Sequence, residues 1–139
     1  MSSKPSGYSG TPLARKLGIA DGSLVHARGA PPDYHAMLEP LPMGMEFVDS
    51  VTELTDIVHV FCDRKAELKA ELEELRYAIR SDAAVWVSWL KKSSRLPTDI
   101  TEDTIRELAL PLGFVDVKVC AVDETWSALK LVIRRELRA

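Results

Sequence analysis

Two nearly continuous apolar runs lie in the middle of the chain, Asp56–Cys62 (DIVHVFC) and Ala84–Trp89 (AVWVSW). Strands that are buried on both faces of a parallel sheet have this composition, because helices cover both sides of such a sheet. Two weaker strands are expected at Leu24–Arg28 and Met45–Val48. The pattern therefore predicts a parallel sheet with Ala84–Trp89 near its centre.

Apolar residues recur at helical spacing between these runs. The clearest helix is expected from its N-cap at Asp63 to about Arg80, with Leu68 and Leu75 on its buried side. A second helix is expected to begin at Thr101, and Pro111 ends or kinks it. Strands and helices thus alternate along the chain, which is typical of α/β folds.

The C-terminal segment has the alternating pattern of an antiparallel hairpin, in Phe114–Val122 and again in Trp126–Arg135. Directly paired residues of a hairpin point to the same side of the sheet. Matching the apolar faces then predicts three pairs: Val119 with Leu129, Val117 with Leu131 and Val115 with Ile133. This register requires an odd number of loop residues, so Asp123-Glu124 cannot form a tight two-residue turn.

Together these elements predict an α/β fold with a mostly parallel, Rossmann-like sheet, flanking helices and a C-terminal antiparallel hairpin. The arrangement resembles the class I methyltransferase fold from about Leu24 to Arg135. In that resemblance Asp56–Cys62 is the fourth strand and Ala84–Trp89 the fifth. The short segment between Val48 and Asp56 leaves little room for the usual third helix and strand, so a truncated sheet is expected.

Three phrases carry a second resemblance: YSGTPLARKLGI, VSWLKKSS and LPTDITEDTIRELALPLGFVDVKVCAVDETWSALKLVIRR. The sequence is similar in them to a family of small bacterial proteins, mostly actinobacterial, known as domain of unknown function 3052. That resemblance implies a compact cytoplasmic protein and assigns no activity or catalytic residue.

Composition sets further limits. Residues 1–10 lack periodicity and are expected to be a flexible tail, and residues 11–139 are expected to form a single α/β domain. The formal net charge of -3 disfavours a nucleic-acid binder. Neither a membrane span nor a secretory signal is present in the pattern, so a cytoplasmic location is expected.

The sequence Lys91-Lys92-Ser93-Ser94-Arg95 directly follows the central apolar run. Ligands of α/β sheets bind at the carboxyl ends of strands, and lysine and serine suit phosphate or carboxylate groups. Arg28, Arg64 and Lys91 are all expected to leave strands at this edge and to form a basic rim there. The ligand-binding candidates are Arg28, Gly29, Arg64, Lys91, Lys92 and Ser93. A solvated charged loop is the alternative interpretation.

A cofactor-binding loop would be expected after the first strand, where methyltransferases need a glycine-rich turn. Here that turn reads His26–Pro32 (HARGAPP), with Gly29 as its one glycine and two prolines that donate no hydrogen bond. Asp49 lies where an acidic residue would bind a ribose. A degenerate sheet without a cofactor is the preferred interpretation, and binding of S-adenosylmethionine is the alternative.

Histidine and cysteine offer weaker candidates. Cys62 and Cys120 are most simply buried free thiols, although Cys62 precedes a helix, where a Cys–His pair with His26 or His59 is conceivable. His59 and Cys62 are three residues apart in one strand and should point to opposite faces. No metal site is therefore predicted.

Trp126 lies beside the predicted hairpin loop. Together with Asp123 and Glu124 it could anchor a protein partner, because tryptophan is enriched at interface hot spots. The alternative is a tryptophan that folds back onto the end of the sheet.

The leading hypothesis is a non-catalytic, degenerate methyltransferase-like domain that binds a small anionic ligand or a protein partner at the strand-end rim. The alternatives are a minimal S-adenosylmethionine-dependent transferase and a protein that forms homodimers through its sheet edge.

Overall fold

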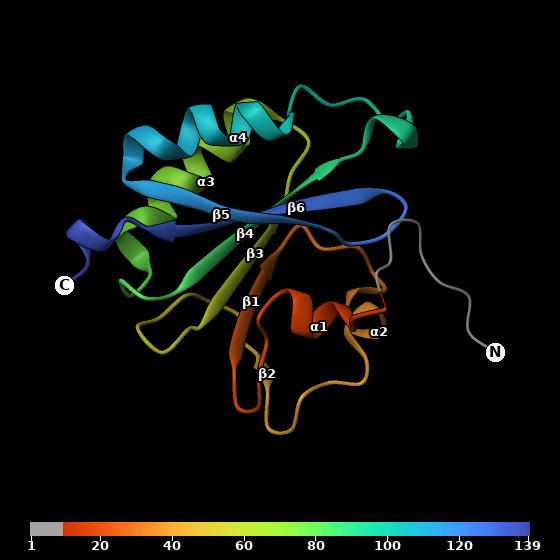
Figure 1. Cartoon of the computed structure of the whole chain (residues 1–139), viewed down its shortest axis with the longest axis vertical. Coiled ribbons are helices and arrows are strands. Elements are labelled where there is room, and N and C mark those ends of the chain that lie inside the picture. Colours follow the sequence, from red (N-terminus) through yellow and green to blue (C-terminus); the bar gives the residue numbers. More distant parts are fainter. Residues whose placement is uncertain (1–9) are drawn as a thin grey trace.

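A computed structural model describes residues 10–139 and contains a six-stranded sheet with helices on both faces (Figure 1). The predicted flexible tail, except for its last residue, lies outside the described residues. The strands are β1 (Leu24–Arg28), β2 (Glu46–Phe47), β3 (Ile57–Phe61), β4 (Ala84–Leu90), β5 (Phe114–Ala121) and β6 (Trp126–Ile133). Their order in the sheet is β2-β1-β3-β4-β6-β5.

Strands β1 to β4 run parallel to one another, whereas β6 is antiparallel to both β4 and β5. The predicted α/β class with a C-terminal hairpin is therefore confirmed. Among the described residues no strand lies between β2 and β3, so the sheet ends at β2. The truncated edge predicted from the short segment after Val48 is confirmed as well.

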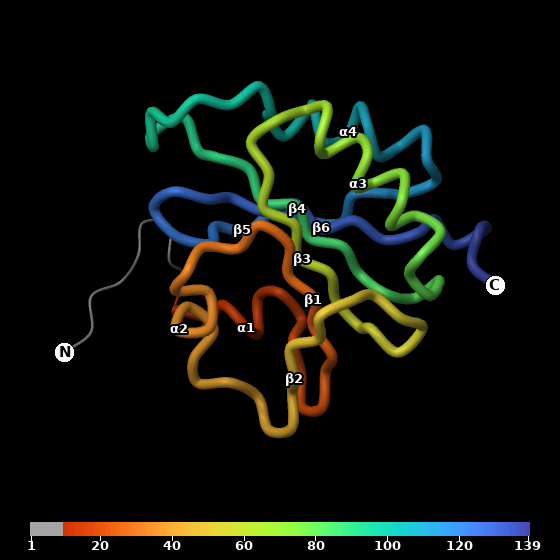
Figure 2. The backbone as a smooth tube through the Cα atoms, turned by 180° about the vertical axis from the view of Figure 1, so that it is seen from behind, coloured from red at the N-terminus to blue at the C-terminus, as the bar shows by residue number. Residues whose placement is uncertain are grey.

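Helices α1 (Leu13–Lys16) and α2 (Tyr34–Leu38) cover one face of the sheet, and α3 (Lys65–Ala78) and α4 (Glu102–Ala109) cover the other (Figure 2). Three short 3-10 helices complete the described part of the chain: η1 (Lys92–Ser94), η2 (Leu110–Leu112) and η3 (Arg135–Leu137). Each face buries its own apolar cluster. Leu72 of α3 belongs to one cluster, and Leu17 and Trp86 belong to the other.

The start of α3 differs from the prediction. Asp63 is not its N-cap, because the helix begins at Lys65 and its N-cap Arg64 makes no side-chain capping bond. The backbone N–H of Lys65 instead donates to Oδ1 of Asp99, at 2.6 Å. A residue from the segment before α4 thus replaces the expected local cap. The prediction for α4 is confirmed, because Thr101 caps it in a reciprocal capping box with Thr104.

The hairpin register is confirmed at one of the three predicted pairs. Val119 lies opposite Leu129, but Val115 lies opposite Val132 and Asp116 opposite Leu131. A β-bulge at Val117 is the reason, since one extra residue shifts every pair beyond it. Asp116 accepts a hydrogen bond from Nε of Arg106 in α4 at 2.8 Å, which holds this shifted register.

The hairpin loop has an odd number of residues, as predicted. Ala121 pairs with Ser127, which leaves five residues between them. Oδ1 of Asp123 accepts the backbone N–H groups of Thr125 and Trp126, each at 2.8 Å. Asp123 therefore stabilises the turn itself.

Candidate functional site

The carboxyl ends of β1, β3 and β4 lie at one edge of the sheet, and two hollows open there. The first, here called the acidic hollow, has a volume of about 460 Å³ and lies at the ends of β1 and β3. Its lining consists of Arg28, Gly29, Phe61, Cys62, Asp63, Glu67, Glu71 and Trp126. The second, here called the cationic groove, has a volume of about 520 Å³ and lies at the end of β4. Its lining consists of Trp89, Leu90, Lys91, Lys92, Arg95, Leu96, Thr98, Ile100, Thr101 and Glu102.

Arg28 at the end of β1 is held by the protein's own carboxylates. Its Nη1 and Nη2 donate to the two carboxylate oxygens of Glu74 at 3.1 and 3.2 Å, and Nη1 also reaches Glu71 at 3.3 Å. Nε donates to Nε2 of His26, whose Nδ1–H donates to the carbonyl of Val48. The hydrogen bond to Glu74 raises the pKa of the Arg28 guanidinium. All three guanidinium nitrogens are thus engaged within the protein.

Gly29 lets the loop after β1 approach β3 closely. Its φ is +68°, and a methyl group on its Cα would lie 2.6 Å from the carbonyl oxygen of Phe61. Only glycine fits this contact without displacing the backbone of β3. The single glycine of the HARGAPP turn is therefore explained by packing against the sheet.

Cys62 and Trp126 close the floor of the acidic hollow. The Trp126 ring packs edge-on against Phe61, with ring centroids 5.1 Å apart, and is half-buried. Burial raises the pKa of the Cys62 thiol, which donates to the carbonyl of Arg64. Cys62 packs with the α3 and α4 cluster, whereas His59 contacts α2 on the other face. The two side chains point to opposite faces as predicted, so the conceivable Cys62–His59 pair does not form.

The cationic groove has a different charge arrangement. Lys91 is half-buried, and Lys92 and Arg95 are exposed. Within residues 10–139 none of these three cations forms an ion pair. Glu102, the one carboxylate in the lining, is paired with Arg106. The groove therefore presents unneutralised positive charge.

The predicted basic rim is divided between these two places. Arg28 and Gly29 line the acidic hollow, and Lys91 and Lys92 line the cationic groove. Arg64 is in the lining of neither hollow. Its side chain is 76% exposed, and its Nε lies 3.7 Å from the Glu67 carboxylate. Ser93 is exposed on η1. The structure thus does not bring the six candidates together into one site.

The structure adds groove residues that the charge pattern did not indicate. The chain from Leu96 to Thr101 returns over the end of β4 and completes the groove. Oγ1 of Thr98 donates to the carbonyl of Asp63, and the backbone N–H of Asp99 donates to the same oxygen. The cluster Leu-Pro-Thr-Asp-Ile between two charged segments was the available signal for this return.

A buried polar chain links α2, β3 and β4. Tyr34 Oη lies 2.7 Å from Nδ1 of His59, and Nε2 of His59 lies 2.7 Å from Oγ of Ser88. His59 and Ser88 are fully buried. Burial lowers the pKa of His59 to about 3 and raises the pKa of Tyr34. His59 is therefore held as a neutral imidazole.

Two features are absent from the part of the chain that the structure describes. No three His, Cys, Asp or Glu side chains within it gather as a metal ion would require. None of its helices combines the length and the apolar character needed to cross a bilayer.

Comparison with known proteins shows a fold relationship. No model of a protein family matches the sequence, and no curated protein matches it. Among solved structures, a SAM-dependent methyltransferase from Aquifex aeolicus is similar, with a TM-score of 0.65, 13% identity and 88% of each chain covered. A type 11 methyltransferase from Sulfolobus solfataricus, described as putative in its own name, gives a TM-score of 0.63 and 10% identity over 91% and 92% of the two chains.

A variant of LepI in complex with SAH and a substrate analogue is also similar, with a TM-score of 0.56 and 12% identity. The match covers 96% of this chain but 50% of LepI. At such identities these similarities show the fold alone. The chain has a methyltransferase-like α/β fold.

Proposed function

We propose that this protein is a ligand-binding domain with a methyltransferase-like fold, and that it binds a small anion in the cationic groove. The observation that carries this proposal is a group of three cations at the carboxyl end of β4, Lys91, Lys92 and Arg95, none of which forms an ion pair among residues 10–139. Lysine and arginine side chains bind phosphate and carboxylate through charge-assisted hydrogen bonds. The strand-end location is where α/β sheets commonly bind ligands.

A thermal-shift screen tests this proposal. The panel contains sulfate, phosphate, sugar phosphates, nucleotides and acyl-coenzyme A. A ligand present at one hundred times its Kd should stabilise the fold by about 2.7 kcal/mol, which corresponds to several degrees in Tm. The Lys91→Ala, Lys92→Ala double variant should lose that shift, and an unchanged shift would contradict the proposed site.

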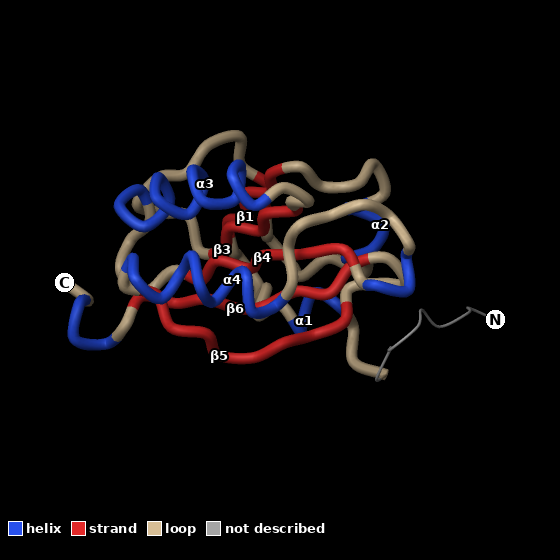
Figure 3. Tube along the Cα trace, turned by 90° about the horizontal axis from the view of Figure 1, so that it is seen from above, coloured by secondary structure: helices blue, strands red, loops and turns tan. Residues whose placement is uncertain are grey.

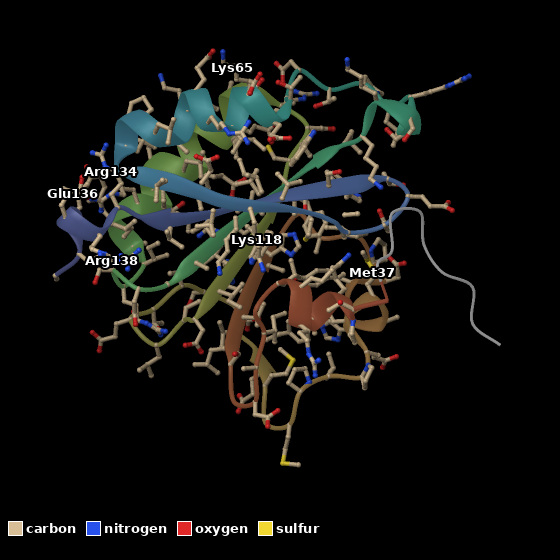
Figure 4. All side chains as sticks on the ribbon, viewed as in Figure 1. Met37, Lys65, Lys118, Arg134, Glu136 and Arg138 are labelled. Carbon is tan, nitrogen blue, oxygen red and sulfur yellow. The ribbon has the colours of Figure 1, made fainter. Side chains whose placement is uncertain are left out.

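The matched control removes two lysines elsewhere, through Lys69→Ala and Lys118→Ala. Both side chains are exposed, Lys69 on α3 and Lys118 on β5. Figure 4 labels Lys118. In the strand register Lys118 lies opposite Lys130, and Lys130 lies opposite Trp86. Lys118 is therefore on the face of the sheet that α1 and α2 cover, away from the groove. This control lowers the net charge equally and should keep the anion-induced shift.

A second candidate function is transfer chemistry with S-adenosylmethionine bound in the acidic hollow. The similar structures favour it, together with Asp63, Glu67 and Glu71, whose carboxylates suit ribose hydroxyls and a sulfonium cation. The loop after β1 does not fit that cofactor, because Gly29 packs against Phe61 and Arg28 is held by Glu74. Calorimetric titration with S-adenosylmethionine and S-adenosylhomocysteine tests this candidate, and no heat at millimolar ligand would reject it.

A further inference from the structure

The cationic groove has an apolar floor beneath its charged rim. Leu90 and Ile100 are buried in it, Trp89 is half-buried, and Leu96 remains 52% exposed. An inorganic anion bound to the rim would leave Leu96 and the open side of Trp89 in water. A ligand with an apolar body would cover both side chains and gain the free energy of that burial.

The apolar surface continues from this floor across the sheet. Trp89 lies opposite Ser127, and Ser127 lies opposite Ala121, so the three share one face. Val119, two residues before Ala121, is on the same face and is 45% exposed. The segment between β4 and α4 is a loop with one short helical turn, and α4 begins only at Glu102 (Figure 3). A partly exposed apolar side chain, Val119, thus lies on the same face of the sheet as Trp89.

Arg95 is the one non-glycine residue with positive φ in residues 10–139, with φ of 59° and ψ of 15°. This left-handed conformation is unfavourable for a residue with a Cβ, and glycine or asparagine adopts it more readily. Arg95 nevertheless occupies it while lining the groove, and it pairs with no carboxylate of the described chain. Strained residues concentrate at sites of function.

We propose that the ligand of the cationic groove is an amphipathic anion. Its carboxylate, sulfate or phosphate head is held by Lys91, Lys92 and Arg95, and its aliphatic or aromatic body lies on Trp89 and Leu96. Arg95 determines the preference for the anionic head, because its planar guanidinium can donate two parallel hydrogen bonds to such a group. This inference rests on the proposed function and adds the ligand class.

A homologous series of probes tests the inference: inorganic sulfate, butyl sulfate, hexyl sulfate and octyl sulfate, each below its micelle concentration. Binding is measured by calorimetry and by the fluorescence of Trp89, with Trp89→Phe identifying its signal. Affinity should rise about fourfold for each methylene that reaches the floor. Sulfate binding with no dependence on chain length would overturn the amphipathic ligand and leave the anion site intact. Failure of every probe to bind would overturn both.

Variants at the head and at the floor separate specific binding from adsorption. Arg95→Gly should lower octyl sulfate affinity at least tenfold while Tm stays equal or rises, because glycine relieves the left-handed backbone. Arg95→Ala should lose the same affinity with a lower Tm than Arg95→Gly. Leu96→Ser should weaken octyl sulfate but not sulfate. Chain-length-dependent binding that survives both Arg95→Gly and Lys91→Ala would place the probes elsewhere and reject the inference.

Discussion

The acidic hollow and the cationic groove lie at the same edge of one sheet, and each received basic residues from the end of a strand. In the acidic hollow the charge of Arg28 is neutralised within the protein, because Glu71 and Glu74 of α3 accept hydrogen bonds from its guanidinium. In the cationic groove Lys91 and Lys92 have no such carboxylate partner within residues 10–139. The charge available to a ligand thus depends on the neighbouring helix as much as on the strand-end residue.

The helices explain why the two places differ. Only three residues separate β3 from α3, and α3 carries glutamates three residues apart on the side that reaches β1. After β4, by contrast, eleven residues intervene before α4, and the acidic first turn of α4 is paired with its own Arg106. An early acidic helix neutralises one rim, and a late, self-paired helix leaves the other rim charged.

The buried chain of Tyr34, His59 and Ser88 joins the segments that carry the two hollows, and the stability that depends on it should fall in acid. His59 has its pKa lowered to about 3 by burial, whereas an unfolded chain has a histidine pKa of about 6.5. Below that value the unfolded chain binds a proton that the folded chain excludes. The free energy of unfolding should therefore fall by up to about 1.4 kcal/mol per pH unit, a loss on the order of 5 kcal/mol in all.

Denaturant titrations between pH 6.5 and 5 measure this effect before most carboxylates take up protons. His59→Gln supplies the control, since it cannot titrate and should flatten the slope over that window. A wild-type slope that His59→Gln leaves unchanged would show that His59 is not the group excluded from protonation.

The close approach of the loop after β1 to β3 depends on Gly29, and Gly29→Ala should have the next largest effect on stability. The backbone at this position has the left-handed φ of +68°, and a Cβ there would lie 2.6 Å from the carbonyl oxygen of Phe61. We expect a loss of about 2–4 kcal/mol in unfolding free energy, from backbone strain and displacement of β3 together. Gly18→Ala is the matched control, because Gly18 has φ of +78° with nothing within 4 Å.

The control should lose about 1–2 kcal/mol, the backbone cost alone. Chemical denaturation of the two variants gives the difference, which reports the contact between the β1 loop and β3. Equal losses would mean that the loop relaxes away from Phe61 without cost.

The sheet could be predicted because its signals are local. Apolar runs and helical spacing identify β3, β4, α3 and α4, and the short segment after Val48 indicates the missing edge. Parity arguments succeeded for the hairpin loop but failed across the bulge at Val117. One inserted residue leaves the alternation of apolar positions almost unchanged, so the pattern could not reveal it.

The site was less predictable because its charged side chains find their partners far away in the sequence. Arg28 is 43 and 46 residues from Glu71 and Glu74, and Lys65 is 34 residues from the Asp99 that caps its helix. A charge pattern shows that acidic partners exist, but it does not show which cation each one reaches. The lysines after β4 could be placed at the strand end from the sequence, whereas only the structure shows that no carboxylate of residues 10–139 pairs with them.

Releasing Arg28 should turn the acidic hollow into a second anion site, with the smallest effect on stability. Glu71→Gln with Glu74→Gln removes both carboxylates and keeps the side-chain shapes. The pairs are partly exposed, with Glu74 60% accessible, so the cost should stay below about 1 kcal/mol. Introduced into the Lys91→Ala, Lys92→Ala background, the pair of changes should restore a sulfate-dependent rise in Tm. Adding Arg28→Gln should abolish that rise. If Tm does not rise in the variant that lacks both glutamates, Asp63 and Glu67 are sufficient to repel anions from the hollow. The difference between the two regions then depends on all of the hollow's carboxylates, and not on the ion pairs of Arg28 alone.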